Sequence, residues 1–176
     1  MRSAEKMEVY ICGFSGSGKT TALEKLRNRD KEILCEDLDH LIAGNVGVGA
    51  QELGKWIQQA GWESFRALEQ KLLHQWSDSQ VGPAKVLALG GGTLDFINWS
   101  QFKELRGPSS RVYLFHLNRP FELCYQVITG DSNRPLGQRP KAELEQLYHE
   151  RKKKFQQADR EFENVDDLVE FICQLL

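Results

Sequence analysis

The stretch from Gly13 to Thr20, with the sequence GFSGSGKT, constrains the fold and chemistry of this chain more than any other. An apolar run at residues 7–12 precedes it and a helical pattern follows it at residues 21–26. This order of strand, glycine-rich loop and helix is that of a phosphate-binding loop. Glycines let successive backbone N–H groups turn toward an anion, and the helix adds unpaired donors and the positive end of its dipole. The stretch therefore predicts a nucleoside triphosphate site rather than a plain connecting turn.

Two side chains at the end of the loop have predicted roles of their own. Lys19 supplies a point charge for the outer phosphates, and Thr20 offers a hydroxyl to Mg²⁺. We expect ATP to contact the loop and the start of its helix through these residues: Gly13, Ser15, Gly16, Ser17, Gly18, Lys19, Thr20 and Thr21.

Composition limits the class of protein and the kind of partner. With 176 residues, 40% hydrophobic and 27% charged, the chain is expected to form one domain over residues 1–176. A net charge of −2 gives no basic footprint for nucleic acid, so a small-molecule partner is expected. No apolar run reaches the roughly 20 residues of a membrane span. Four scattered cysteines without metal-ligand spacing suit a reducing compartment, so we expect a cytoplasmic protein without a zinc site or disulfides. We also expect a monomer, because no long apolar stripe is left over once the core is assigned.

Apolar, β-branched runs alternate with helical patterns along the chain. The expected strands are residues 7–12, 32–35, 85–89, 111–117 and, more weakly, 162–165. Such alternation is typical of an α/β fold with a parallel sheet covered by helices on both faces. Ligands of these sheets bind at the carboxyl ends of the strands, so functional side chains are expected just after each run.

Two aspartates follow the second run. If the chain stays extended there, Asp37 and Asp39 project to the same side, near the phosphates. Many phosphate-loop enzymes hold Mg²⁺ with an Asp at the end of a later strand, but the third and fourth runs here end without one. Asp37 is therefore the predicted magnesium carboxylate, directly or through water, and Asp39 is predicted to meet a substrate hydroxyl. The alternative for either residue is a helix N-cap.

A helical pattern at residues 61–76 places a charged residue within its apolar stripe. Phe65, Glu69 and Trp76 share one helical face, and Arg66 lies beside Glu69. Charges on a buried face are costly unless they are paired. Two interpretations stay open: an ion pair at the rim of the core, or a pocket for a polar ligand.

Three further features are candidates for binding. Gly90, Gly91 and Gly92 follow the third strand, where bare backbone suits close approach of a ligand, although a sharp turn is the alternative. The polar segment 129–141, with Arg134 and Arg139, suits a mobile lid over phosphates, although an exposed loop is the alternative. Arg151 falls on the apolar face of the next helix, and its planar fork suits a carboxylate.

Taken together, these motifs resemble the shikimate kinase family in order and spacing over nearly the whole chain. The matching pieces are Gly13–Thr20, the DLDHLI run at 37–42, Gly61 with FRALE at 65–69, LGGG at 89–92, RPL at 134–136, ER at 150–151 and AD at 158–159. The resemblance implies a doubly wound, five-stranded parallel sheet of the phosphate-loop kinase type. It also implies a substrate-binding helical region at about residues 38–77 and a mobile lid at about 129–141.

The activity that the resemblance implies is Mg²⁺-dependent transfer of the γ-phosphoryl group of ATP to the 3-hydroxyl of shikimate, a step toward chorismate and the aromatic amino acids. The implied catalytic residues are Lys19, Asp37, Asp39 and Arg134, with Arg134 also contacting ATP from the lid. The implied substrate contacts are Asp39, Arg66, Glu69, Gly90, Gly91, Gly92 and Arg151. The resemblance further implies that Thr20 and Asp37 bind the metal, and that Asp39 binds ring hydroxyls and is the candidate proton acceptor.

The chain departs from the family pattern at the expected adenine contact, where Val127 replaces the usual arginine and Arg139 is a candidate substitute. Trp62 also stands where the family carries a carboxylate. Two alternatives to a shikimate kinase remain: a kinase of the same fold acting on another hydroxy acid such as gluconate, and an ATP-binding paralogue without turnover. A GTPase is disfavoured because no N-K-x-D guanine signature is present.

Overall fold

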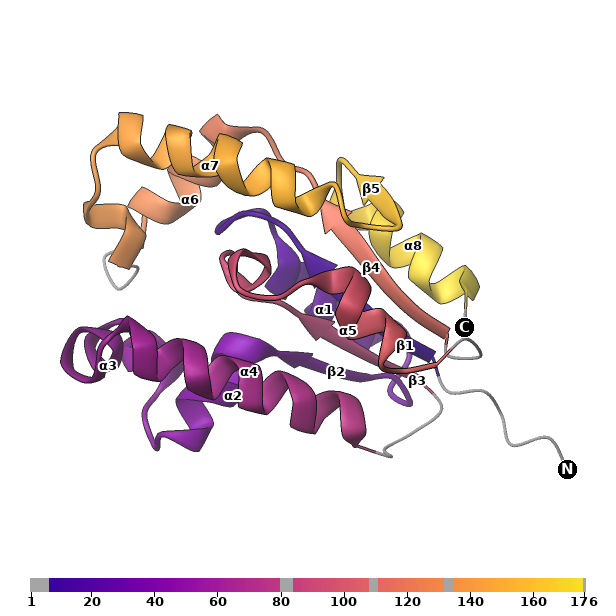
Figure 1. The fold of residues 1–176 in the computed structure, drawn as a ribbon. Coiled ribbons are helices and arrows are strands. Elements are labelled where there is room, and N and C mark those ends of the chain that lie inside the picture. Colours follow the sequence, from indigo (N-terminus) through magenta and orange to yellow (C-terminus); the bar gives the residue numbers. More distant parts are fainter. Residues whose placement is uncertain (1–6, 80–83, 108–110, 132–134, 176) are drawn as a thin grey trace, which may run out of the picture.

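The computed structural model describes residues 7–79, 84–107, 111–131 and 135–175, which form a parallel sheet between two layers of helices (Figure 1). The sheet has the order β2-β3-β1-β4-β5, and all four neighbouring pairs are parallel. The strands are β1 (Met7–Cys12), β2 (Leu34–Asp37), β3 (Ala84–Ala88), β4 (Arg111–Leu117) and β5 (Arg160–Phe162). The expected doubly wound five-stranded sheet is therefore confirmed.

Eight α-helices and three short 3₁₀ helices lie in the described ranges. The α-helices are α1 (Lys19–Arg29), α2 (Leu38–Asn45), α3 (Leu53–Ala60), α4 (Trp62–Asp78), α5 (Trp99–Glu104), α6 (Phe121–Thr129), α7 (Lys141–Phe155) and α8 (Val165–Leu175). The 3₁₀ helices are η1 (Ala50–Glu52), η2 (Thr93–Asp95) and η3 (Pro135–Gln138). Across this part of the chain, no helix is both long enough and apolar enough to cross a membrane.

The sheet separates two hydrophobic cores, as the alternation of side chains along each strand requires. On one face, Val9 and Ile11 of β1 pack with residues of α1 and α8, such as Leu23 and Ile172. On the other face, Tyr10 belongs to a larger core that also takes in residues of α2 through α7. Helices therefore cover both faces of the sheet.

The observed strands differ from the expected runs mainly where polar residues enter the sheet. The first and fourth runs match β1 and β4, but β2 begins at Leu34 and continues to Asp37, which pairs with Ala88 of β3. Pairing with β3 keeps this polar end of β2 in the sheet. The expected strand at 162–165 was wrong in most of its length, because β5 spans Arg160–Phe162 and α8 begins at Val165. The first two residues of this edge strand, Arg160 and Glu161, are exposed and give no apolar pattern.

The carboxyl ends of the strands meet at one edge of the sheet, and the connection from β1 to α1 lies at this edge. In Figure 1, α2–α4 and α6–α7 lie on opposite sides of it. β1 occupies the centre of the sheet, between β3 and β4. Open α/β sheets bind ligands at such a position.

Candidate functional site

The loop after β1 wraps around the N-terminus of α1. Gly16 has a φ of +78°, and a Cβ there would lie 2.8 Å from the carbonyl oxygen of Cys124, so both conformation and space require glycine. Ser17 is buried, and its hydroxyl finds no hydrogen-bond partner among the residues with described positions. The first turn of a helix leaves backbone N–H groups unpaired, and these favour an anion at its N-terminus. The local geometry thus suits a nucleotide phosphate group.

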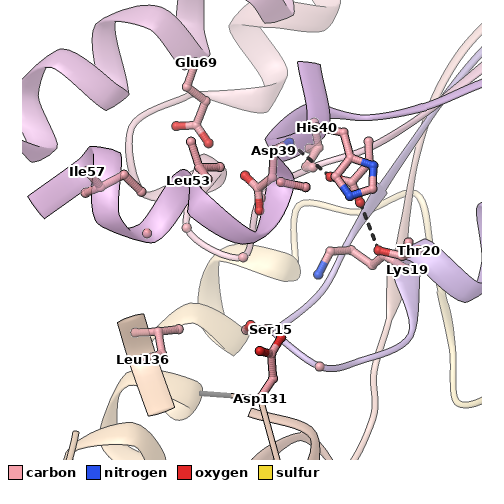
Figure 2. A pocket seen from close by; sticks show the side chains of 18 of the residues that line it. Ser15, Lys19, Thr20, Asp39, His40, Leu53, Ile57, Glu69, Asp131 and Leu136 are labelled. Carbon is pink, nitrogen blue, oxygen red and sulfur yellow. Dashed lines mark hydrogen bonds between the residues drawn. The ribbon is translucent and has the colours of Figure 1, made fainter. Parts of the chain in front are cut away.

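Lys19 folds back over the loop at the start of α1. Its Nζ donates to the carbonyl oxygens of Gly13, at 2.7 Å, and Phe14, at 3.0 Å. Burial lowers the pKa of Lys19, and the neighbouring carboxylates of Asp37 and Asp39 oppose that effect. In Figure 2 the Lys19 ammonium lies between Asp39 and Ser15. An ammonium group in this place can exchange its carbonyl partners for phosphate oxygens.

Asp37 is the N-cap of α2, the alternative that the sequence left open, and it also contacts Thr20. Its Oδ1 accepts from the backbone N–H of Asp39 at 3.0 Å and so caps α2. Its Oδ2 accepts from the Thr20 hydroxyl, also at 3.0 Å. The expectation that the chain stays extended through both aspartates was wrong, because α2 begins at Leu38 and Asp39 lies in its first turn. Capping by Asp37 favours this early helix start.

The Thr20 hydroxyl and the Asp37 carboxylate form a pair of hard oxygen donors that fits Mg²⁺. Within the described parts of the chain, no group of three or more His, Cys, Asp or Glu side chains could hold a metal alone. Magnesium usually takes one or two protein oxygens and completes its shell with phosphate and water. The donor set is therefore of the kind that binds magnesium together with a nucleotide.

Asp39, Glu69 and Gly90 meet on the other side of the pocket. A Cβ on Gly90 would lie 3.2 Å from Oδ1 of Asp39 and 3.1 Å from Oε1 of Glu69. Thr93 donates to the same Glu69 oxygen at 2.7 Å. Burial raises the pKa of Asp39 to about 6, helped by the carboxylates of Asp37 and Glu69 and opposed by Lys19 and Arg66. Asp39 is thus a carboxyl whose pKa is raised toward neutral pH, a property that suits a general base.

Two guanidinium groups converge on Gly92. A Cβ there would collide with Nη2 of Arg151 and would lie 2.7 Å from Nη2 of Arg66. Arg66 pairs with the fully buried Glu69 at 2.6 Å, so the rim pair and the pocket, considered above as alternatives, are both present. The absent side chain at Gly92 therefore makes room for these two arginines, whose combined positive charge suits an anion.

Aromatic rings surround Arg66. Its Cζ lies 4.6 Å from the ring centroid of Phe96, 5.0 Å from that of Phe65 and 5.4 Å from that of Trp62. Trp62 and Phe96 are about half exposed. Stacking on aromatic faces stabilises a guanidinium and restricts its orientation. Sequence reasoning treated Trp62 only as a departure and missed Phe96, whose position in the chain gives no periodic signal.

A cavity of about 460 Å³ joins these groups. The predicted site residues that line it are Ser15, Gly16, Gly18, Lys19, Thr20, Thr21, Asp37, Asp39, Arg66, Glu69, Gly90, Gly91, Gly92 and Arg151. Gly13 and Ser17 are buried within the loop and do not line the cavity, and Arg134 lies outside the described residues. Residues that the sequence reasoning did not assign to the site include His40, Leu53, Ile57 and Arg119.

The segment expected to act as a lid contributes Asp131 and Leu136 to the cavity wall, opposite Leu53 and Ile57 (Figure 2). Its movement stays a prediction. Val127 lines the cavity beside Gly16, so the side chain at the expected adenine contact does face the pocket.

Arg139, considered as a substitute for the missing arginine, is exposed and does not line the cavity. Arg119 is the cation beside the phosphate loop, with its Nη1 at 3.4 Å from the carbonyl oxygen of Gly16.

The sheet order, the loop after β1 and the helices around it define a kinase of the phosphate-loop class. The family model described as shikimate kinase matches residues 15–175, and the chain belongs to that family. A shikimate kinase of Persephonella marina is 29% identical over 86% of this chain and 85% of its own. One from Dechloromonas aromatica is 32% identical over 81% of this chain and 73% of its own. Among solved structures, a shikimate kinase of Acinetobacter baumannii in complex with shikimate matches with a TM-score of 0.78 and 28% identity, covering 98% of this chain and 93% of its own.

Proposed function

We propose that the protein is a shikimate kinase that transfers the γ-phosphoryl group of ATP to the 3-hydroxyl of shikimate. The observation that carries the proposal is that the phosphate loop and the pair Arg66 and Arg151 line one cavity. A Cβ on Gly91 would lie 3.1 Å from the backbone nitrogen of Ser15 in the phosphate loop and 3.7 Å from Nη1 of Arg151. A nucleotide phosphate and an acidic acceptor can therefore meet over the bare backbone of Gly91. Family membership supports shikimate as that acceptor.

The proposed roles follow from the charges and distances of the site. Arg66 and Arg151 bind the carboxylate of the acceptor beside Gly92. Asp39 binds the attacking hydroxyl and takes its proton, for which a pKa of about 6 is suited. Lys19 and the loop N–H groups stabilise the charge on the transferring phosphoryl group. Arg134 is proposed to join them from the lid.

We also propose that Mg²⁺ binds beside Thr20 and Asp37 together with the nucleotide. The ion would neutralise phosphate charge during transfer, while the pairing of Thr20 with Asp37 keeps both oxygens in place. From the length, the cysteine usage and the lack of a leftover apolar stripe in the sequence, we propose that the chain works as a single-domain, cytoplasmic monomer.

The test is coupled ADP release from the purified protein with ATP and Mg²⁺, comparing shikimate, gluconate, quinate and no acceptor. We expect release that depends on shikimate. Lys19→Ala should abolish it, because the positive charge of Lys19 beside the transferring phosphoryl group is lost. Lys25→Ala is the matched control, since Lys25 lies on the same helix but pairs with Asp166 at the surface.

If gluconate stimulates ADP release and shikimate does not, gluconate is the acceptor instead of shikimate. ATP binding without stimulation by any acceptor would contradict the proposal and favour a paralogue without turnover.

A further inference from the structure

Asp95 holds one of the two guanidinium groups beside Gly92, although it does not itself line the cavity. It is the last residue of η2, just after the glycines that follow β3. Its Oδ2 accepts a hydrogen bond from Nε of Arg151 at 3.0 Å. The Arg151 side chain is 12% exposed and that of Asp95 is 29% exposed, so the pair lies partly shielded from water.

The contact determines which edge of the guanidinium faces the pocket. Arginine presents its donors in a rigid planar fork, so fixing Nε also fixes the direction of the terminal nitrogens. Here those nitrogens lie beside the glycines, with Nη1 near Gly91 and Nη2 against Gly92. The end of the fork that suits a carboxylate is therefore left for a ligand, while Asp95 occupies only the side.

Charge balance gives Asp95 a second effect. Arg66 and Arg151 carry like charges beside the same residue, Gly92, and so repel each other. Each has an acidic partner behind it: Glu69 for Arg66, and Asp95 for Arg151. Without Asp95, repulsion from Arg66 would favour rotation of Arg151 away from the pocket.

We propose that Asp95 is a positioning residue that orients Arg151 to bind the carboxylate of the phosphoryl acceptor. This inference rests on the proposed function of the site. Asp95 acts through Arg151 and takes no part in the phosphoryl transfer itself. Its loss therefore raises the KM for the acceptor and leaves kcat and the KM for ATP almost unchanged.

Two substitutions separate the parts of this role. Asp95→Ala removes both the acceptor oxygen and the charge, and we expect the KM for the acceptor to rise about 10- to 100-fold, as for loss of a hydrogen bond to a charged group. Asp95→Asn keeps an oxygen that can accept from Nε but lacks the charge, so a smaller rise is expected. Asp166→Ala is the control, because it breaks an exposed ion pair with Lys25 away from the cavity.

The experiment is steady-state ADP release with shikimate and ATP varied in turn, for the wild type and the three variants. The expected order of KM for shikimate is wild type and Asp166→Ala lowest, then Asp95→Asn, then Asp95→Ala. An unchanged KM for ATP shows that each variant is folded. An unchanged or lowered KM for shikimate in Asp95→Ala would overturn the inference, and a lowered value would mean that Asp95 competes with the substrate.

The wild type separates this inference from the proposed function. If the wild type turns over shikimate and Asp95→Ala behaves like it, only the inference about Asp95 fails. If the wild type prefers another acid, the acceptor assignment fails and the same series is measured with that acid. If the wild type uses no acidic acceptor, both are overturned.

Discussion

Replacing Asp39 with asparagine is expected to make the protein more stable and inactive at the same time. The two side chains have the same shape, so the substitution mainly removes the ability to ionise. In the folded protein, burial and the carboxylates of Asp37 and Glu69 raise the pKa of Asp39 to about 6 from an ordinary value of 3.8. Ionised Asp39 is therefore less favourable in the folded state than in the unfolded chain.

The magnitude follows from linkage between proton binding and folding. Since one pKa unit corresponds to about 1.4 kcal/mol, a rise from 3.8 to about 6 costs the wild type about 3 kcal/mol once Asp39 is ionised. Below pH 4 the group is protonated in both states and this cost is absent. The cost grows as the pH rises from about 4 to about 6 and is complete by about pH 7.

The assay is urea unfolding of the wild type and Asp39→Asn at a series of pH values from 4 to 8. We expect the free energy of unfolding of the variant, relative to the wild type, to grow by up to about 3 kcal/mol over this range. Its kcat should fall at least about 100-fold at pH 7, because the proton acceptor is lost. The pairing of higher stability with lost activity is common for functional residues.

Asp166→Asn provides a control whose stability difference should not change with pH. The hydrogen bond from Lys25 lowers the pKa of Asp166, so the stabilising effect of its ionised form is nearly complete by pH 4, and the free energy of unfolding of this variant relative to the wild type should stay almost constant from pH 4 to 8. A stability difference for Asp39→Asn that stays constant from pH 4 to 8 would refute the reasoning about Asp39. Normal turnover in the same variant would refute its role as proton acceptor.

The remaining predictions concern three other positions. Gly92→Ala places a methyl group against both guanidinium groups, so the KM for shikimate should rise at least about tenfold with little change in the KM for ATP. A KM for shikimate equal to that of the wild type would mean that the arginines can move aside. Lys85→Met leaves Glu8 without its buried partner and removes a bond to the carbonyl oxygen of Trp76, so urea unfolding should show a loss of about 3 to 5 kcal/mol. Since Lys85 lies away from the cavity, a changed kcat would contradict a purely structural role. Val127→Arg adds a cation where the adenine is expected, so the KM for ATP should fall about two- to fivefold, and a higher KM would place the base elsewhere.

The sequence predicted those parts of the site that depend on local order along the chain. The phosphate loop was recognisable because a strand, glycines and a helix follow one another within residues 7–29. Asp37 and Asp39 were found for the same reason, since they follow the end of a strand. Their geometry was not predicted, because the hydrogen bond from the Asp39 N–H to Asp37 starts α2 earlier than the sequence pattern shows.

Contacts between distant segments could not be predicted in this way. Asp95 lies 56 residues from Arg151, in a short 3₁₀ helix without hydrophobic periodicity. Thr93, which donates to Glu69, has the same location and the same lack of a signal. From the sequence, an ion pair at the rim and a ligand pocket were alternatives for Arg66, whereas the ion pair of Arg66 with Glu69 is itself part of the pocket wall. The sequence could not show this, because only the fold shows what lies opposite α4.

The most direct test of the central claim is the identity of the phosphorylated product. The protein would be incubated with ATP, Mg²⁺ and shikimate, and the product examined by ³¹P and ¹H NMR spectroscopy. The proposed function predicts a phosphate monoester whose phosphorus couples to the ring proton at carbon 3 of shikimate. Inorganic phosphate alone, or an ester at another hydroxyl, would contradict the arrangement of Asp39, Arg66 and Arg151 proposed for this pocket.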